Sequence, residues 1–118
     1  TRAAASGLTR PAIDYSHANL AETISIDTLA QITHLSKSYF MGQFKKAAGV
    51  GAIEYINQLR IKRACHLLTD TAKSVAEIAF ACGFRNLSNF NRQFRGYVSC
   101  TPGEYRRITE GMKAAASG

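Results

Sequence analysis

Residues 79–106, AFACGFRNLSNFNRQFRGYVSCTPGEYR, decide the fold of this chain. They predict the end of one helix, a tight turn at Gly83, a second helix, and a short third helix that starts at Pro102. Phe90 and Phe94 are four residues apart and therefore share one face of the second helix. The opposite face carries polar and basic side chains, namely Ser88, Arg92 and Arg95. Two helices that meet at a glycine turn, with the second apolar inside and basic outside, are typical of a helix-turn-helix that reads DNA.

The composition excludes several classes of protein. At 118 residues the chain forms one domain or two very small ones. Its 15 Lys and Arg against 8 Asp and Glu give a net charge of +7, so polyanions are the first partners to consider. Cys65, Cys82 and Cys100 lack the C-x-x-C spacing of a zinc site, and their odd number does not suit a disulfide framework, so we expect buried free thiols. No apolar run is long enough to span a membrane and no signal peptide is visible, so we expect a cytoplasmic protein.

Both ends of the chain carry the same five residues, Ala-Ala-Ala-Ser-Gly. This duplication indicates sequence added in cloning, and we expect residues 1–7 and the tail 111–118 to lie outside the natural domain. The rest is expected to come from a longer protein. It divides into a first helix-turn-helix subdomain at 8–50, a linker helix at 51–69 and a second helix-turn-helix subdomain at 70–110.

Helix signals along the chain predict an all-α fold of about seven helices, with no strand. Pro11 suits the first turn of a helix, and Ile13, His17, Leu20 and Ile24 follow it at helical spacing. The later boundaries come from capping residues and glycines: Ser25 and Ser36 as N-caps, Gly49 as a helix end, Ser74 with Glu77 as a capping box, Asn86 as an N-cap, and Thr101 with Glu104 as a second capping box.

The third and sixth expected helices can be overlaid with an offset of 50 residues. The pairs match a cap, a polar residue, two rings and a cation: Ser36 with Asn86, Ser38 with Ser88, Phe40 with Phe90, Phe44 with Phe94, and Lys45 with Arg95. The chain therefore holds two helix-turn-helix units joined by the helix at 51–69. A helix of about 18 residues is roughly 27 Å long. With the thickness of the units added, two recognition helices would lie about one DNA turn, roughly 34 Å, apart and enter successive major grooves. The alternative is a helical bundle in which the repeat only packs a core.

Two motifs stand out in the second unit: Ile78-Ala-x-x-x-Gly83-Phe84-x-x-x-Ser88-x-Phe90-x-Arg92-x-Phe94-Arg95 and Thr101-Pro102-x-x-Tyr105-Arg106. The first unit and the linker helix add Leu29-Ala30, Leu35-Ser36, Phe44-Lys45-Lys46, Gly49, Tyr55, Arg60 and Ala64. Together these residues closely resemble the signature of the AraC/XylS family of bacterial transcription regulators. The resemblance covers residues 24–107.

Membership in that family would imply an all-helical, homeodomain-like DNA-binding domain of seven helices, normally attached to a separate effector-binding or dimerisation domain. Most members activate transcription near promoters by contacting RNA polymerase. The resemblance therefore implies a domain without enzyme activity, cofactor or metal, monomeric by itself, whose partners are double-stranded DNA and, in the full-length protein, RNA polymerase. His34 and Ser99 stand where the family usually has glycine, which leaves the geometry of the first turn and the end of the sixth helix open.

The family's base-reading positions fall on outward residues near the start of the third and sixth helices. They are Ser38, Met41, Gly42 and Lys45 in the third helix, and Ser88, Asn91, Arg92 and Arg95 in the sixth. Arg92 can bind guanine O6 and N7 through two parallel hydrogen bonds, and Asn91 or Asn89 can pair with adenine. We expect phosphate contacts from Lys37, Lys45, Lys46, Arg85 and Arg95, and from the helix N-termini capped by Ser36 and Asn86.

Gly42 occupies the position in the third helix that Arg92 occupies in the sixth. Either the first unit contributes mainly phosphate contacts, which we favour, or Gly42 lets the helix backbone lie deep in the groove with Met41 against a thymine methyl. Sequence discrimination is therefore expected in the second unit. Two other classes of function stay open: a DNA alkyl-repair enzyme, which needs an activated cysteine, and a protein-interaction module that has lost DNA binding. No metal-ligand spacing or catalytic triad is present.

Overall fold

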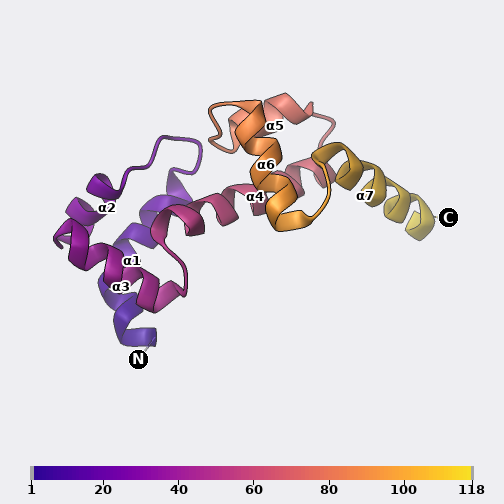
Figure 1. Ribbon diagram of the computed structural model, residues 1–118. Coiled ribbons are helices and arrows are strands. Elements are labelled where there is room, and N and C mark those ends of the chain that lie inside the picture. Colours follow the sequence, from indigo (N-terminus) through magenta and orange to yellow (C-terminus); the bar gives the residue numbers. More distant parts are fainter. Residues whose placement is uncertain (1, 118) are drawn as a thin grey trace. The chain divides into compact units, whose positions relative to one another are not determined.

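The computed structural model describes residues 2–117, with side chains from residue 7 onward. This part of the chain forms seven α-helices and no strand, which confirms the all-α prediction (Figure 1). In chain order the helices are α1 (Arg2–Ala18), α2 (Ile26–Thr33), α3 (Lys37–Ala48), α4 (Ala52–Asp70), α5 (Val75–Ala81), α6 (Leu87–Val98) and α7 (Pro102–Ser117). Thr1 and Gly118, the outermost residues of the two ends that we expect to be added sequence, lie outside the described residues.

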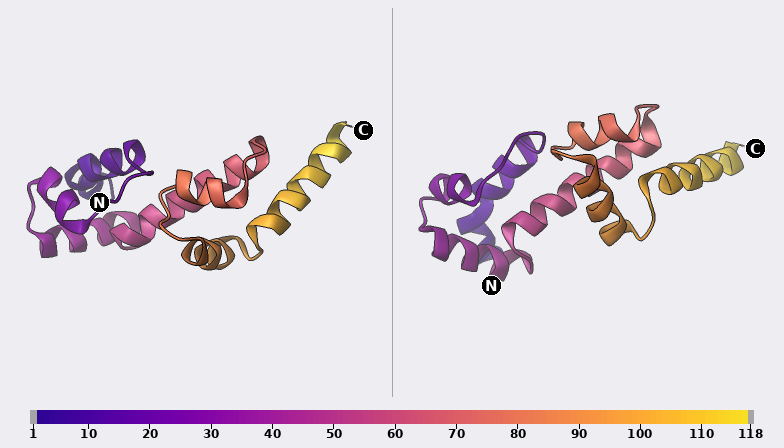
Figure 2. Two further views of the ribbon diagram at one scale, coloured as in Figure 1. Left: turned by 90° about the horizontal axis from the view of Figure 1, so that it is seen from above. Right: turned by 45° about the horizontal axis from the view of Figure 1, so that its top comes forward.

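The chain divides into two compact units after Leu59, and each unit has a hydrophobic core of its own. In the first unit α1 packs against α2 and α3, and the three helices lie side by side in every view (Figures 1 and 2). The centre of this core is formed by Leu29 from α2, Phe40 and Phe44 from α3, and Ile56 from α4, all at most 2% exposed. The two phenylalanines thus lie on the buried face that their spacing predicted.

The second unit is built around α6, which contacts both α5 and α7. Phe90 and Phe94 from α6 are fully buried, together with Ile78 from α5 and Leu68 from α4. The predicted inward direction of both rings is confirmed. The α4 helix contributes to both cores, because Ile56 packs in the first and Leu68 in the second.

The N-caps that the sequence predicts for α2, α3 and α6 are confirmed. Ser25, Ser36 and Asn86 each accept a hydrogen bond from the backbone N–H three residues further along, at 3.1, 3.2 and 2.7 Å. Each cap satisfies one of the backbone donors that the first turn of a helix leaves without a partner. The starts of these helices are therefore set by local sequence.

Both predicted capping boxes are complete. At the start of α5, Ser74 Oγ accepts from the Glu77 N–H at 3.1 Å, and the Glu77 carboxylate accepts from the Ser74 N–H at 3.0 Å. At the start of α7, Thr101 Oγ1 accepts from the Glu104 N–H at 3.1 Å, and the Glu104 carboxylate accepts from the Thr101 N–H at 2.9 Å. In the internal repeat of the chain, α5 corresponds to α2, and α7 corresponds to α4.

The first helix differs from the prediction at both ends. α1 begins at Arg2, so Pro11 lies inside the helix rather than in its first turn. Alanine is the best helix former, and the alanines before the proline extend the helix although Pro11 lacks the N–H that would bond one turn back. α1 ends at Ala18, so Leu20 and Ile24 reach the core from the connection to α2 and not from a helix face.

The last helix is longer than the short helix that we expected. α7 runs to Ser117 and includes the described part of the tail, residues 111–117. Three consecutive alanines near its end favour helix. Arg106 joins α7 to the end of α4, because its Nε donates to the Leu68 carbonyl at 3.2 Å and its Nη2 to the Thr71 carbonyl at 3.1 Å.

Two residues other than glycine adopt the left-handed conformation at the end of a helix. His34 has φ 59° and ψ 31°, and Ser99 has φ 69° and ψ 18°. Gly49 and Gly83 hold the corresponding positive φ values, 83° and 94°. His34 and Ser99 therefore adopt the left-handed geometry that glycine would give at these positions. The α6 helix ends at Val98, directly before its cap Ser99.

The internal repeat extends beyond the third and sixth helices. Ser25 and Ser74, which cap α2 and α5, are 49 residues apart, whereas Ser36 and Asn86 are 50 apart. The segment from the N-cap of α5 to the N-cap of α6 therefore has one residue more than the segment from the N-cap of α2 to the N-cap of α3. Arg85, directly before the Asn86 cap, is the additional residue.

Ring packing repeats in the same register. Phe44 and Tyr55 meet edge-on with centroids 5.3 Å apart and an interplanar angle of 71°. Phe94 and Tyr105 do the same at 5.7 Å and 77°. The start of α4 in the first unit thus corresponds to the start of α7 in the second.

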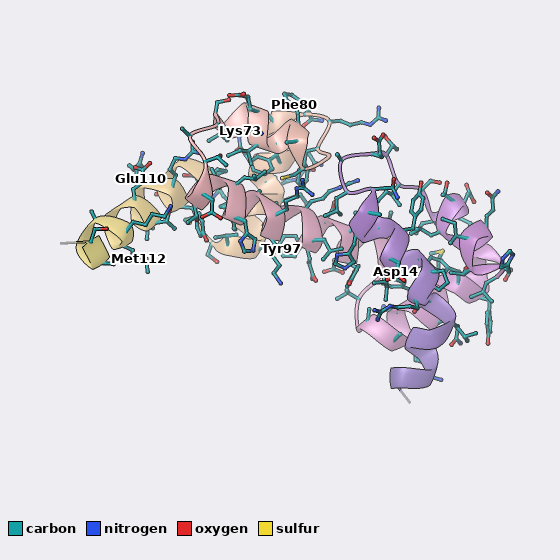
Figure 3. All side chains as sticks on the ribbon, turned by 180° about the vertical axis from the view of Figure 1, so that it is seen from behind. Asp14, Lys73, Phe80, Tyr97, Glu110 and Met112 are labelled. Atoms are coloured by element: carbon teal, nitrogen blue, oxygen red, sulfur yellow. The ribbon has the colours of Figure 1, made fainter. Side chains whose placement is uncertain are left out.

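A few large apolar side chains point away from the cores. Phe80 on α5 and Met112 on α7 are 54% and 66% exposed (Figure 3). Single exposed apolar residues are common on soluble surfaces. Within residues 2–117, no helix combines the length and the apolar character needed to cross a bilayer.

Candidate nucleic-acid interface

The polar face of α6 is exposed because its opposite face is anchored in the second core. The rings of Phe90 and Phe94 are 5.8 Å apart, and Phe84 packs edge-on against Phe90 at 5.1 Å. These contacts set the rotation of α6 about its own axis. Three predicted DNA-binding residues lie opposite the rings and are exposed: Ser88, Arg92 and Arg95.

Two asparagines flank the buried face of α6. Asn89 and Asn91 are one residue before and after Phe90, so each points about 100° away from the ring direction. Both are consequently half-buried, at the border between the core and the exposed face. Their amides can reach the polar face while their stems rest against the unit.

A hydrogen bond joins two of the predicted DNA-binding residues. Arg92 Nη2 donates to Asn89 Oδ1 at 2.7 Å. The contact was not predicted, although a spacing of three residues on a helix brings two side chains together and could have indicated it. Arg92 therefore reaches the surface with one donor already bound to its own helix.

The α3 helix is positioned in the same way in the first unit. Phe40 and Phe44 are 0% and 1% exposed, with ring centroids 5.7 Å apart. The outward face of α3 carries Ser38, Met41, Gly42 and Lys45, all exposed. This face differs from that of α6 because it has a thioether and a bare backbone where α6 has an amide and a guanidinium.

Three lysines surround the outward face of α3. Lys37, Lys45 and Lys46 are all exposed. Lys37 Nζ lies 3.6 Å from Asp27 Oδ1, and both side chains of this pair are more than half exposed. Exposed ion pairs contribute little to stability, so Lys37 can exchange its carboxylate for a phosphate at small cost.

A groove of about 780 Å³ lies beside α3 within the first unit. It is lined by Met41, Gly42 and Lys45 of α3, by Ile26 of α2 and by residues 49–54 at the start of α4. A Cβ atom added at Gly42 would meet no atom within 4 Å. Packing within the unit therefore does not require glycine at this position.

The structure places the fourteen predicted DNA-binding residues on two surfaces, one in each unit. The first holds Ser36, Lys37, Ser38, Met41, Gly42, Lys45 and Lys46; the second holds Arg85, Asn86, Ser88, Asn89, Asn91, Arg92 and Arg95. All are exposed except the half-buried Asn89 and Asn91. Arg85 lies in the turn before α6, next to the N-terminus that Asn86 caps.

The cysteines lie in or against the core of the second unit. Cys82 is fully buried, and burial raises the pKa of its thiol to about 11. Burial also raises the pKa of Cys65. A thiol with a raised pKa is mostly protonated at neutral pH and is a poor nucleophile. No group of three or more His, Cys, Asp or Glu side chains within the described residues could hold a metal ion.

The model of a helix-turn-helix domain family matches residues 29–108. An AraC-type DNA-binding domain-containing regulator from Chromobacterium violaceum has the same fold, with a TM-score of 0.83 and 31% identity over 91% of this chain and 96% of that one. The chain belongs to the AraC-type helix-turn-helix family. Two helix-turn-helix motifs, centred on α3 and α6, are the features by which this chain fits the AraC-type fold.

Two further comparisons concern function. The transcriptional activator RhaS of Enterobacter sp. (strain 638) is 37% identical over 89 residues, which are 75% of this chain and 32% of that protein. The DNA-binding domain of AdpA, solved in complex with a target DNA, has a TM-score of 0.83 and 25% identity over 86% of this chain and 92% of that one. The chain spans about a third of the length of the curated relatives it matches.

Proposed function

We propose that this chain is the sequence-specific DNA-binding domain of a bacterial AraC-type transcriptional regulator. The observation that carries the proposal is the face of α6, which exposes Ser88, Arg92 and Arg95 while Phe90 and Phe94 hold it to the core. A helix of this kind fits the major groove, where hydrogen-bond donors and acceptors distinguish all four base pairs. The complex of the AdpA domain with its target DNA supports the same assignment.

In the second unit, Arg92 binds guanine O6 and N7 through two parallel N–H groups, and Asn91 pairs with adenine. Arg85 and Arg95 bind phosphates on either side of the groove, and the N-terminus of α6, capped by Asn86, favours a phosphate as well. These roles follow from the side-chain chemistry, from the exposure of Arg85, Arg92 and Arg95, and from the position of Asn91 at the border of the exposed face of α6.

In the first unit, the binding energy comes mainly from phosphates. Lys37, Lys45 and Lys46 supply the charge, and α3 supplies an N-terminus capped by Ser36. Gly42 has no side chain to place against a base edge. Discrimination between sequences is therefore concentrated in the second unit, with Ser38 and Met41 as lesser contributors.

The α3 and α6 helices enter successive major grooves of one duplex. The α4 helix has 19 residues, which at 1.5 Å per residue amounts to about 28 Å. With the thickness of the two units this is close to the roughly 34 Å of one DNA turn. One chain would then read two half-sites without a dimer.

Selection of bound duplexes from a random pool tests the proposal. We expect two motifs about one helical turn apart, with the stronger preference in the motif that depends on Arg92. The substitution Arg92→Ala should cost about 1–3 kcal/mol and relax preference at one base pair. Ser38→Ala and Met41→Ala serve as matched changes in α3. If either of them reduced sequence specificity more than Arg92→Ala does, the assignment of sequence discrimination mainly to the second unit would be wrong.

A mobility shift on random duplex separates this function from a protein-interaction module. DNA binding through Lys37, Lys45, Lys46, Arg85 and Arg95 releases counterions, so affinity must fall steeply as salt rises. A module that no longer binds DNA would show no shift at low salt. An alkyl-transfer assay should be blank, because burial raises the pKa of Cys82 to about 11 and also raises the pKa of Cys65, which makes both thiols poor nucleophiles.

The parent protein carries, in this proposal, a further domain that binds an effector or another subunit. It acts in the bacterial cytoplasm and contacts RNA polymerase at promoters, as an activator. The name of the RhaS relative, a transcriptional activator, supports this direction of regulation. The fragment itself binds DNA as a monomer.

A further inference from the structure

The hydrogen bond between Arg92 and Asn89 changes the role that the sequence suggests for Asn89. An asparagine at this position is a candidate for pairing with adenine through its amide. Its Oδ1, however, accepts from Arg92 Nη2 at 2.7 Å, which is a short and therefore strong contact. Pairing with adenine uses the Oδ1 acceptor and the amide donor of one asparagine together. One of the two Oδ1 lone pairs is bound to Arg92, so the Asn89 side chain is oriented by its own helix.

We propose that Asn89 is a positioning residue that holds the Arg92 guanidinium in the orientation that reads guanine. The inference rests on the proposed DNA reading by α6 and adds the group that sets its geometry. Asn89 suits this role because it is half-buried beside Phe90, and its own backbone N–H donates to the Asn86 cap at 2.7 Å. The main chain of Asn89 is thus fixed by the cap of α6, and the stem of its side chain is partly buried.

The guanidinium keeps a complete pair of donors while Asn89 is bound. Arginine has five N–H groups, and its two planar forks, Nε with Nη2 and Nη1 with Nη2, use different hydrogens of Nη2. One Nη2 hydrogen points to Asn89, so the fork that uses the other hydrogen remains for guanine O6 and N7. Asn89 therefore selects which fork faces the groove and reduces the number of rotamers that DNA binding must order.

The first unit provides an internal comparison. Tyr39 and Gly42 occupy the positions in α3 that Asn89 and Arg92 occupy in α6. Tyr39 is 52% exposed, and Gly42 has no side chain for it to hold. The pair of a reading residue with its positioning residue therefore occurs in one copy of the repeat, and it is the copy to which we assign sequence discrimination.

The test measures base preference at each position of the selected site by competition binding. Asn89→Leu removes the acceptor at constant size, and Asn89→Asp keeps an oxygen in place. We expect Asn89→Leu to reduce discrimination about 3–10-fold at the base pair that Arg92→Ala affects. Asn89→Asp should keep that discrimination while weakening binding to all sequences alike, because it adds a negative charge near phosphates.

The double variant Asn89→Leu/Arg92→Ala decides between positioning and direct reading. A positioning residue loses its effect once Arg92 is gone, so the double variant should match Arg92→Ala alone. A loss of preference at a second base pair in Asn89→Leu, or losses that multiply in the double variant, would overturn the inference and make Asn89 a direct reader. Thermal unfolding of each variant shows whether a change in folding is the cause, since a purely structural effect would lower all affinities without changing base preference.

The same experiment separates this inference from the proposed function. If the unsubstituted chain selects no motif, the proposed DNA reading fails and the positioning role falls with it. If the chain selects a motif that depends on Arg92 but Asn89 acts at another base pair, only the positioning role fails.

Discussion

Two residues hold a left-handed backbone conformation without the freedom of glycine. In α2 and α6 the last turn ends at His34 and Ser99, with φ of 59° and 69°. A side chain in this conformation brings Cβ too close to the following carbonyl oxygen. The chain tolerates this because both turns are held by backbone hydrogen bonds, such as the Ser99 N–H to the Arg95 carbonyl at 2.9 Å.

Replacing Ser99 or His34 by glycine should therefore stabilise the fold. We expect Ser99→Gly and His34→Gly each to raise the free energy of unfolding by about 0.5–1 kcal/mol. This value is the difference between the backbone strain that glycine relieves in the folded state and the conformational entropy that it adds to the unfolded chain. Urea denaturation at a constant m-value measures the change. The matched control is Gly49→Ala, at φ 83° with open space around the added Cβ, which should lose about 1 kcal/mol. If Ser99→Gly had a lower urea midpoint than the unsubstituted chain, the left-handed backbone at Ser99 would not be strained.

Gly42 is a residue whose helical position offers no structural reason for glycine. No atom lies within 4 Å of an added Cβ, so Gly42→Ala should stabilise α3 by about 1 kcal/mol through helix propensity alone. In the proposed function the first unit binds mainly phosphates, so DNA affinity should stay within about twofold of the original. Gly96→Ala in α6 is the matched control, because Gly96 is also helical, exposed and free of neighbours at its Cβ.

The opposite outcome for Gly42→Ala is equally informative. A stable variant that loses tenfold or more in DNA affinity, roughly 1.4 kcal/mol, would mean that a methyl group at this position meets the duplex. The α3 backbone would then lie deep in the groove with Met41 near a base. That result would transfer part of the sequence discrimination to the first unit.

At the scale of whole helices, the two capping boxes predict how stability responds to acid. The backbone N–H of Ser74 lowers the pKa of Glu77, and the backbone N–H of Thr101 lowers the pKa of Glu104, below the ordinary value of 4.5. A carboxyl whose pKa is lower in the folded state binds protons more readily when unfolded. Its contribution to stability is therefore present above pH 4.5 and is lost as the pH falls through the folded pKa.

The double variant Glu77→Gln/Glu104→Gln tests this contribution. Glutamine keeps an acceptor for the capping hydrogen bond but does not titrate. We expect the melting temperature of the original chain to fall more between about pH 6 and pH 3 than that of the double variant. Glu110→Gln is the control, because Glu110 is an exposed residue in the middle of α7 without a capping role (Figure 3). Equal falls in all three proteins would show that the boxes do not contribute to acid sensitivity.

The same elements show which parts of the fold a sequence can predict. The starts of α2, α3, α5, α6 and α7 follow from capping side chains that bond to backbone groups three residues away, so the information is local. The buried faces of α3 and α6 follow from two phenylalanines four residues apart. The bounds predicted for α1 and α7 were wrong, because the balance between alanine propensity and a single proline or glycine decides how far each helix runs.

The candidate site is predictable to a similar degree. Exposure of Ser88, Arg92 and Arg95 follows from their position opposite the buried rings, which periodicity alone indicates. The hydrogen bond from Arg92 to Asn89 does not follow from periodicity, because a spacing of three residues brings two side chains within reach of each other without fixing which contact they make. Rotamers decide which of these contacts forms, and a pattern of residue types does not contain them.

At the scale of the whole molecule, the proposed function makes α4 the spacer between two half-sites. Seven residues inserted after Leu59 add about 10.5 Å, or close to two helical turns, so each unit would keep its own face of α4. On DNA that length corresponds to about three base pairs, and after three base pairs the major groove faces another side of the duplex. We therefore expect an EAAAKEA insertion to reduce affinity for the selected two-motif site to that of a single unit.

A longer insertion should restore binding at a new spacing. Five EAAAK repeats are predominantly helical, and their 25 residues add about 37 Å, or about eleven base pairs, close to one full DNA turn. Selection with this variant should recover two motifs separated by about two helical turns, because the second unit again meets a major groove on the same side. Units that bind DNA independently of α4 would select the original spacing in both variants, and the spacer role would then be wrong even though each unit still reads its own motif.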